Sequence, residues 1–236
     1  MLRLGMKAVS AWAVSLAVAG CVSTIGGTAV PAGGRGPGTK PAPAKPAVTA
    51  ADLPKLLATL DEIKDIMKAP EMVTQQTWNQ PDASTDTKVE PVECMSAVFS
   101  GEASSYNGSG FTAIYTVRQA DPKGVPDVDE GVAAFDNAAA AQSFVSKSVA
   151  QWRQCAGKQL TWTWPDGSVI PWVVGDPAES GGLVTVRNTA ALSPDLAVVR
   201  SMAAKSNVVV DLQIMGIRMG DVAPEIAKRI LDRIPG

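Results

Sequence analysis

The sequence predicts an α+β fold, in which a largely antiparallel β-sheet is covered by helices and follows a disordered tether. Three observations predict it. The 236-residue chain carries segments of helical and strand period in the order helix, strands, long helix, strand meander, helix. Two strand segments between residues 160 and 174 are joined by a tight turn, as in a β-hairpin. The long helical segments each have one apolar face, which can pack on a sheet.

The first 20 residues predict a secretory signal. Arg3 and Lys7 form a short basic start, and the apolar run from 8 to 19 is too short to span a bilayer comfortably. The run ends in Val18-Ala19-Gly20-Cys21, which resembles the bacterial lipobox, where the signal is cleaved before a cysteine that receives a diacylglycerol. A plain secretory signal would not need Cys21, and a retained transmembrane helix would need a longer apolar run.

Cys21 is therefore the expected lipidation site, and the new amino terminus is expected to be acylated as well, with palmitate or a similar chain. Two or three acyl chains, at roughly 0.8 kcal/mol per buried methylene, make a durable anchor. Residues 21–50 are rich in Gly, Pro and Ala without apolar periodicity, which predicts a disordered spacer. The expected location is the outer face of a bacterial plasma membrane.

The folded domain is expected at residues 51–236, and its first elements are short. Thr59 and Glu62 have the spacing of a capping box, which predicts a helix that begins after Thr59 and is stopped by Pro70. Residues 71–93 are polar and rich in turn formers, so we expect them to cross the surface without regular structure. A short strand is expected at 95–99.

The middle of the domain is expected to hold two strands and the long helix. A turn at 104–110 precedes a β-rich strand at 111–117, and a second strand is expected at 128–135. Asp136 lies where an N-cap is needed for a helix over 137–155. One apolar stripe on that helix contains Ala141, Phe144, Val145, Ser148, Trp152 and Cys155.

The last part of the domain alternates strands and turns before a final helix at 222–234. In the last strand Val208, Val210, Leu212 and Ile214 alternate with Val209, Asp211, Gln213 and Met215, which predicts one face in the core. The expected strands are 160–164, 169–174, 183–188, 197–203 and 208–215.

The charge balance and the histidine content of the chain exclude several classes of function. The chain has 21 basic and 23 acidic side chains, and removal of residues 1–20 leaves 19 against 23, a net charge of −4. We therefore expect no nucleic-acid partner and no polybasic contact with anionic lipid. The chain has no histidine, which excludes Ser-His-Asp and Cys-His catalysis within it. A zinc site would have to rely on two cysteines and carboxylates, a ligand set that disfavours one. We expect no cofactor and no enzymatic activity.

With Cys21 lipidated, Cys94 and Cys155 are left. Two remaining cysteines in an exported domain favour a disulfide, which would close a loop of about 60 residues and contribute on the order of 4 kcal/mol. Two free buried thiols are the alternative. A catalytic thiol is disfavoured because no histidine can activate it.

Four segments of the domain carry short motifs. An opening helix lies at 56–62, and a Tyr-x-Gly-Ser-Gly-aromatic stretch lies at 106–111. The long helix ends in Trp-x-x-Cys, at 150–157, which is the most specific of the four, and an Asn-Val-Val-x-Asp strand lies at 206–211. Together, and in this order, they resemble the family of extracellular sensor domains found in mycobacterial serine/threonine protein kinase H and in a set of mycobacterial lipoproteins.

The resemblance implies a two-layer sandwich with a central antiparallel sheet and a large cleft, which senses an unidentified ligand outside the cell. Many members of the family carry a second disulfide, whose cysteines would fall near Val198 and at Met215. This chain has apolar residues at both positions, so packing and ladder hydrogen bonds alone must hold the two strands there.

Trp162, Trp164 and Trp172 are the candidate ligand-binding residues. They cluster on the predicted hairpin, and strand alternation places Trp162 and Trp164 on one face. They could form a stacking platform for a sugar or an apolar ligand in a cleft. The commoner explanation for such a cluster is a sheet face covered by a helix.

The acidic candidates have simpler interpretations. Asp136 is expected to cap a helix, Asp211 to be a solvated carboxylate on the polar face of its strand, and Glu62 and Asp65 to be surface charges. One sequence does not establish two carboxylates at the separation that a glycosidase needs.

We therefore expect a membrane-anchored extracytoplasmic lipoprotein whose sensor domain binds a small envelope ligand or a membrane protein partner without catalysis. Any signal would then pass through a separate protein. An accessory protein of an envelope complex is one alternative, and a carboxylate-dependent envelope hydrolase is another.

Overall fold

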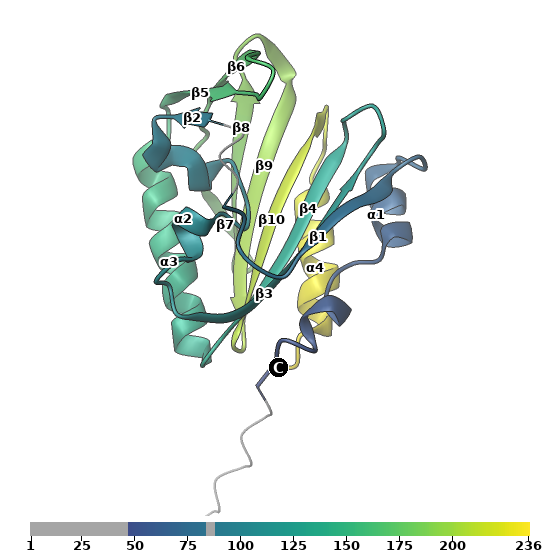
Figure 1. Ribbon diagram of the computed structural model, residues 1–236, viewed down its shortest axis with the longest axis vertical. Coiled ribbons are helices and arrows are strands. Elements are labelled where there is room, and N and C mark those ends of the chain that lie inside the picture. The colour runs from purple at the N-terminus through teal and green to yellow at the C-terminus, as the bar shows by residue number, and fades with distance from the viewer. Residues whose placement is uncertain (1–46, 84–87) are drawn as a thin grey trace, which may run out of the picture. The chain divides into compact units, whose positions relative to one another are not determined.

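A computed structural model describes residues 47–83 and 88–236, in which ten strands form one antiparallel sheet (Figure 1). The strand order is β1-β3-β4-β10-β9-β8-β6-β5-β2, and β7 pairs with β8 outside this path. The strands are β1 (Val73–Trp78), β2 (Lys88–Glu90), β3 (Phe111–Ala120), β4 (Asp127–Phe135), β5 (Gln159–Thr163), β6 (Val169–Val173), β7 (Ala178–Ser180), β8 (Leu183–Ala190), β9 (Ser193–Lys205) and β10 (Val208–Ile217).

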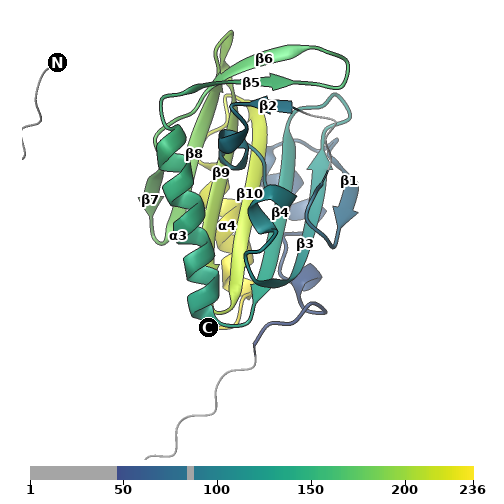
Figure 2. The same ribbon diagram turned by 60° about the vertical axis from the view of Figure 1, so that its left-hand side comes forward.

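Helices cover both faces of the sheet. Figures 1 and 2 show α3 against one face and α4 against the other, with α1 beside α4. The helices are η1 (Leu53–Lys55), α1 (Leu60–Met67), η2 (Val92–Ala97), α2 (Ala103–Tyr106), α3 (Ala138–Cys155) and α4 (Val222–Arg233), where η denotes a 3₁₀ helix. The predicted fold class, an antiparallel sheet with helical cover, is confirmed, and the helices lie on both faces of the sheet rather than in one second layer.

Two hydrophobic cores lie on the two sides of β10. Val208, Val210, Leu212 and Ile214 face the core shared with η1, α1 and α4. Val209 and Met215 face the core shared with η2, α2 and α3. The strand therefore alternates as predicted, but both of its faces are buried between Val208 and Gly216, because helices cover the sheet on each side.

The capping box of α1 is present. The Thr59 side chain accepts a hydrogen bond from the Glu62 backbone N–H, and the Glu62 carboxylate accepts one from the Thr59 N–H at 2.8 Å. Glu62 also pairs with Arg233 at the end of α4, at 2.6 Å, so it joins two helices and is half-buried rather than a simple surface charge. These contacts hold its pKa at about 2, chiefly through the hydrogen bond from Arg233. Asp65 is exposed, as expected, and pairs with Lys68 at 3.4 Å.

The cap of α3 differs from the prediction by one residue. Asn137, and not Asp136, is the N-cap, and its side chain accepts a hydrogen bond from the Ala140 N–H at 2.9 Å. Asn and Asp cap helices about equally well, so the sequence pattern alone did not separate the two neighbours. At the other end, Gly157 has a φ of 75°, which suits the turn that closes with the Lys158 N–H to Cys155 O hydrogen bond.

Two predictions about residues 71–99 were wrong. The polar stretch 71–93 contains β1 and β2, which are edge strands of the sheet, where solvent-facing polar side chains are tolerated. The segment 95–99 is not a strand, because residues 92–97 form η2. The expected turn at 104–110 opens with the short helix α2.

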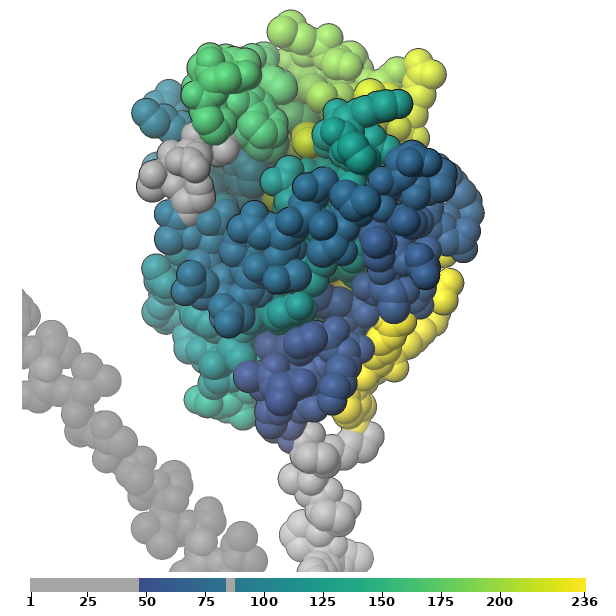
Figure 3. Space-filling view, turned by 45° about the vertical axis from the view of Figure 1, so that its right-hand side comes forward, coloured from purple at the N-terminus to yellow at the C-terminus, as the bar shows by residue number. Residues whose placement is uncertain are grey.

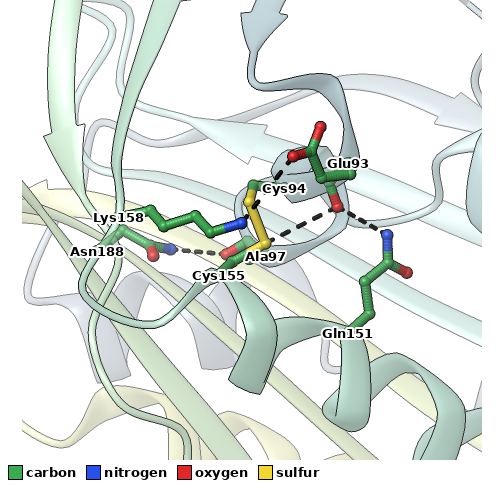
Figure 4. The surroundings of a disulfide bond; sticks show 7 residues. All are labelled: Glu93, Cys94, Ala97, Gln151, Cys155, Lys158 and Asn188. Atoms are coloured by element: carbon green, nitrogen blue, oxygen red, sulfur yellow. Dashed lines mark hydrogen bonds and ion pairs between the residues drawn. A yellow bond between two sulfur atoms is a disulfide. The ribbon is translucent and has the colours of Figure 1, made fainter.

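A disulfide joins Cys94 in η2 to Cys155 at the end of α3 (Figure 4). Gln151 Nε2 donates a hydrogen bond to Glu93 O at 2.7 Å beside it, and Lys158 lies 3.9 Å from the Glu93 carboxylate. The long helix and the segment that follows β2 are therefore joined by one covalent bond and by polar contacts around it.

The predicted signal 1–20, Cys21 and residues 21–46 of the predicted tether lie outside the described residues. In the part of the chain that the structure describes, no helix is both long enough and apolar enough to cross a membrane.

Candidate functional site

A cleft of about 380 Å³ opens on the α3 side of the sheet. Figure 3 views the molecule with the β1 and α1 side of Figure 1 turned forward, and shows the green hairpin of β5 and β6 above the blue segment that contains β1. Its volume lies within the range of small-molecule sites, ~300–1,000 Å³. It is lined by Gln76, Trp78, Gln80, Asp82, Met95, Phe99, Ser100, Gly101, Glu102, Thr116, Arg118, Asp127, Asp129, Trp162, Trp164, Gln213 and Met215.

One wall of the cleft is aromatic. Trp162 in β5 and Trp164 just after it stack with ring centroids 4.6 Å apart and planes 16° from parallel. The Phe99 ring meets Trp162 edge-on at 4.5 Å. The predicted shared face of Trp162 and Trp164 is present, because residues i and i+2 of a strand point to the same side. Trp164 is partly exposed, so this wall offers an aromatic surface to the cleft.

Trp172 does not line the cleft. It lies in β6, is fully buried, and packs behind Trp162 at a centroid distance of 5.8 Å. The sequence allows the tryptophan cluster to be either a ligand-stacking platform or a covered sheet face, and the three residues divide between these two roles. Trp172 is a core residue, Trp164 faces the cleft, and Trp162 does both, since it is 2% exposed and yet lines the cavity.

The floor of the cleft is the polar part of the sheet. Asp129 in β4 lies directly opposite Arg118 in β3 on one side and Gln213 in β10 on the other. The Arg118 guanidinium donates to both oxygens of Asp127, with Nε at 3.1 and 3.2 Å. The Gln76 position of β1 is opposite Arg118, so the floor continues to the edge strand.

Buried polar side chains fix the segment that separates the aromatic wall from the floor. Gln213 Oε1 accepts a hydrogen bond from the Ser100 N–H at 3.1 Å, and Asp211 Oδ2 accepts one from the Gly101 N–H at 3.0 Å. Asn188 Nδ2 donates to Ala97 O at 2.7 Å (Figure 4). The backbone of residues 94–101 is therefore tied to two strands, β10 and β8, in addition to the disulfide. We call residues 94–101 the strap.

Asp211 is the centre of this network, contrary to the expectation of a solvated carboxylate. It is 1% exposed and forms an ion pair with the buried Arg200 at 2.7 Å. The Tyr106 hydroxyl donates to Asp211 Oδ2 at 3.1 Å. Burial and the Asp211 charge raise the pKa of Tyr106, so the phenol keeps its proton and remains a donor. The prediction failed because the second face of β10, which alternation assigned to solvent, is covered by η2 and α2.

Arg200 connects Asp211 to the strap and to α3. Its Nε donates to Ser96 O at 3.3 Å, Nη1 donates to Leu212 O, and its guanidinium lies 5.3 Å from the Trp152 ring centroid. A buried arginine needs such partners, because an unpaired charge in the core is costly. The charges that hold the strap are thus compensated inside the fold.

Two carboxyl groups of the cleft have strongly raised pKa values. Burial, followed by repulsion from Asp82, raises the pKa of Glu102 to about 7. Burial, followed by repulsion from Asp127, raises the pKa of Asp129 to about 8. Asp129 Oδ1 is enclosed and has no hydrogen-bond partner among the described residues. Near neutral pH these two groups hold protons for much of the time, and each can donate or accept a hydrogen bond.

The functional residues that sequence reasoning missed are mostly on the floor. Asp127 and Asp129 occupy alternate positions at the start of β4, a strand that also contains Glu130 and is otherwise apolar, and that pattern could have marked them. Glu102 and Arg118 give no comparable signal. Their role depends on which segments cross the sheet, and a single sequence does not show this.

Val198 in β9 and Met215 in β10 lie directly opposite each other. Both are buried in the same core, and Met215 also lines the cleft. The two positions where the resemblance leads us to expect further cysteines are thus adjacent, and apolar packing occupies them here. Within the described residues, no group of three or more His, Cys, Asp or Glu side chains is arranged to hold a metal ion.

Comparison with known proteins agrees with this architecture. The family model of the PknH-like extracellular domain matches residues 48–233. Serine/threonine-protein kinase PknH of Mycobacterium tuberculosis is 30% identical over 199 residues, which cover 83% of this chain and 32% of the kinase. Serine/threonine-protein kinase PknJ of the same organism is 31% identical over 204 residues, covering 81% of this chain and 34% of the kinase. The chain thus spans about a third of the length of these curated relatives.

A solved structure shares the fold. The crystal structure of the extracellular domain of PknH from Mycobacterium tuberculosis superposes with a TM-score of 0.75 at 28% sequence identity. The superposition covers 80% of this chain and 97% of that domain, so the similarity extends over the sheet and its helical cover.

Proposed function

The chain belongs to the PknH-like extracellular domain family, and from this premise we propose that its sensor domain binds a small ligand in the cleft between the strap and β1, without catalysis. One observation carries the proposal. A cavity with an aromatic wall and several converging polar groups is bounded by a segment that a disulfide and buried hydrogen bonds hold in place. Sites of this composition are typical of small-molecule recognition.

The fixed strap favours binding over a purely structural role. Rigid walls lower the entropic cost of binding, because fewer side chains must be ordered when the ligand enters. Of the candidate ligand residues, Trp164 and the cleft-facing side of Trp162 are retained in this proposal. Trp172 supports them from the core.

The proposal places the domain outside the cell, in agreement with the extracellular family to which it belongs. We further propose that Cys21 carries the lipid and that residues 21–50 act as the spacer between membrane and domain. The supporting observation is the lipobox-like run that ends at Cys21. Replacing Cys21 by Ser should release the protein from the membrane fraction. Retention of the variant at the membrane would contradict lipid anchoring.

Native mass spectrometry tests ligand binding. We would purify the full chain in mild detergent from its own envelope and compare it with the Trp164→Ala variant. We expect an adduct on the first protein that is lost on denaturation and is reduced on the variant. Val169→Ala, an exposed position in β6 outside the cleft lining, is the matched control and should keep the adduct. A bare mass for all three proteins would contradict the proposal.

A carboxylate hydrolase is the second candidate function. The observation that favours it is the presence of two protonatable carboxyl groups, Glu102 and Asp129, in a cleft that also holds the carboxylate of Asp127. A general acid near neutral pH needs such a raised pKa. Release of reducing ends from envelope polysaccharide, abolished by Glu102→Gln or Asp129→Asn, would establish it. Saturable binding without turnover would exclude it.

A further inference from the structure

We propose that the ligand of this cleft is an amine-bearing saccharide, with the ammonium group over Asp129 and Glu102 and a sugar ring against Trp164. This inference rests on the proposed function of the cleft and names the ligand class. It combines three independent features of the lining, namely its charge, its aromatic wall and its unpartnered polar atoms.

The charge of the lining disfavours anions. Four carboxyl groups line the cleft, from Asp82, Glu102, Asp127 and Asp129, and Arg118 is the one basic residue among its described lining residues. The Arg118 guanidinium is already engaged by both oxygens of Asp127. A phosphate or carboxylate ligand would therefore meet four carboxyl groups and a cation that is already paired.

The other charged groups near Glu102 and Asp129 do not add a free positive charge to the cleft. Glu102 faces Asp82, Arg200 and Asp211, and Asp129 faces Asp127, Arg118, Arg200 and Asp82. Arg200 is held by Asp211 at 2.7 Å, just as Arg118 is held by Asp127. Both nearby guanidinium groups thus have a carboxylate of their own, and no basic side chain among the described residues lies at ion-pair distance from Glu102 or Asp129.

An ammonium group on the ligand would give the carboxyl groups of Glu102 and Asp129 a positively charged partner. Burial, with repulsion from Asp82 and Asp127, favours the protonated forms of Glu102 and Asp129, and a cation bound in the cleft beside them would offset both effects. One oxygen of Asp129 has no hydrogen-bond partner among the described residues, so the group is not satisfied by the fold itself. Binding of a cation is then coupled to proton release and strengthens as pH rises.

The aromatic wall of the cleft indicates that the ligand also contains a sugar ring. Trp164 is partly exposed and is backed by Trp162, whose ring is held by Phe99 and Trp172. A ring fixed in this way presents a flat apolar face at little entropic cost. Sugar rings and cations both bind such faces. The Nε1 of Trp162, a residue that lines the cleft, has no hydrogen-bond partner in the described part of the chain.

A series of matched probes tests the inference on the full chain in detergent, by tryptophan fluorescence and calorimetry. The probes are 2-aminoethyl, 2-hydroxyethyl and carboxymethyl β-cellobioside, which differ in charge, and ethanolamine, which lacks the sugar. We expect the aminoethyl compound to bind at least tenfold more tightly than the hydroxyethyl compound at pH 8.5. We expect this preference to shrink at pH 5.5, where both carboxyls are protonated and the alkylammonium is still charged.

Two variants test whether the preference for the aminoethyl compound comes from the cleft or from the overall charge of the protein. Asp129→Asn should reduce the preference for the aminoethyl compound about tenfold at pH 8.5, whereas Asp65→Asn, which removes an exposed charge from α1, should leave it unchanged. Equal binding of the hydroxyethyl compound, tighter binding of the carboxymethyl compound, or equal binding of ethanolamine would overturn the inference. So would the failure of every probe to bind up to 10 mM, on the order of weak fragment affinities. An envelope adduct that proves neutral or anionic would also overturn it, while leaving the proposed function intact.

Discussion

Replacing Asp211 by Asn should destabilise the domain by about 3–5 kcal/mol at pH 7, because the substitution leaves the Arg200 charge buried and unpaired. The two side chains are each 2% exposed, and the charged atoms are 2.7 Å apart. Asp211 Oδ2 also accepts hydrogen bonds from the Gly101 N–H and the Tyr106 hydroxyl. Asn has one acceptor oxygen, so it can keep part of these contacts but cannot balance the charge.

Urea unfolding of the full chain, followed by tryptophan fluorescence, measures this loss. Asp195→Asn is the matched control, because it breaks an ion pair with Arg218 of similar length, 2.8 Å, whose side chains are 54% and 79% exposed. The control should cost less than about 1 kcal/mol. The double variant Arg200→Met/Asp211→Leu should recover much of the stability, since an apolar pair leaves no unpaired charge.

A cost for Asp211→Asn as small as that of the control would refute this reasoning. It would mean that water reaches the pair, and that the strap is not fixed by a buried charge network. If the double variant recovers stability but binds the envelope ligand poorly, the network serves to position the cleft wall rather than to stabilise the fold.

Three further predictions concern other parts of the domain. Replacing Cys94 and Cys155 by Ser should lower stability by about 4 kcal/mol, as expected for a cross-link over 61 residues, and a loss below about 1 kcal/mol would contradict that estimate. Burial raises the pKa of Glu130 to about 8, so its ionisation opposes folding, and stability should fall as pH rises from about 4.5 to 8, by up to about 1.4 kcal/mol per unit. Thermal melts should show a smaller fall in Glu130→Gln, and an unchanged pH profile would exclude Glu130 as the cause. Trp164→Ala should weaken ligand binding about tenfold with little change in melting temperature, whereas Trp172→Ala should cost about 3–5 kcal/mol of stability.

Much of the fold was predictable from local pattern. The capping box at Thr59, the helix that ends at Cys155, the hairpin that carries Trp162 and the last strand and helix all lie close to where periodicity and turn residues placed them. Such features depend on neighbours within a few residues, which are visible in the sequence. The sequence also indicated the disulfide, because two cysteines were left in a domain expected to be exported.

The sequence could not show which segments cover which surface. Residues 73–78 are polar and look like a surface loop, yet they pair with β3 as an edge strand, where one polar face costs little. Asp211 alternates with apolar residues and looks solvated, but the strap and α2 cover that face. Trp162, Trp164 and Trp172 form one cluster in the sequence, and packing alone separates the cleft residue from the core residue.

By itself, then, the sequence determined the period and order of the elements, the excluded chemistries and the family resemblance, since each depends on composition or short-range spacing. The tertiary structure alone decided the cleft. Its walls come from β1, which ends at Trp78, from the strap, and from β5, which begins only at Gln159, and its floor comes from β3, β4 and β10. Burial then set the charge state of Glu102 and Asp129, because a carboxyl group takes its pKa from the surroundings that folding brings to it.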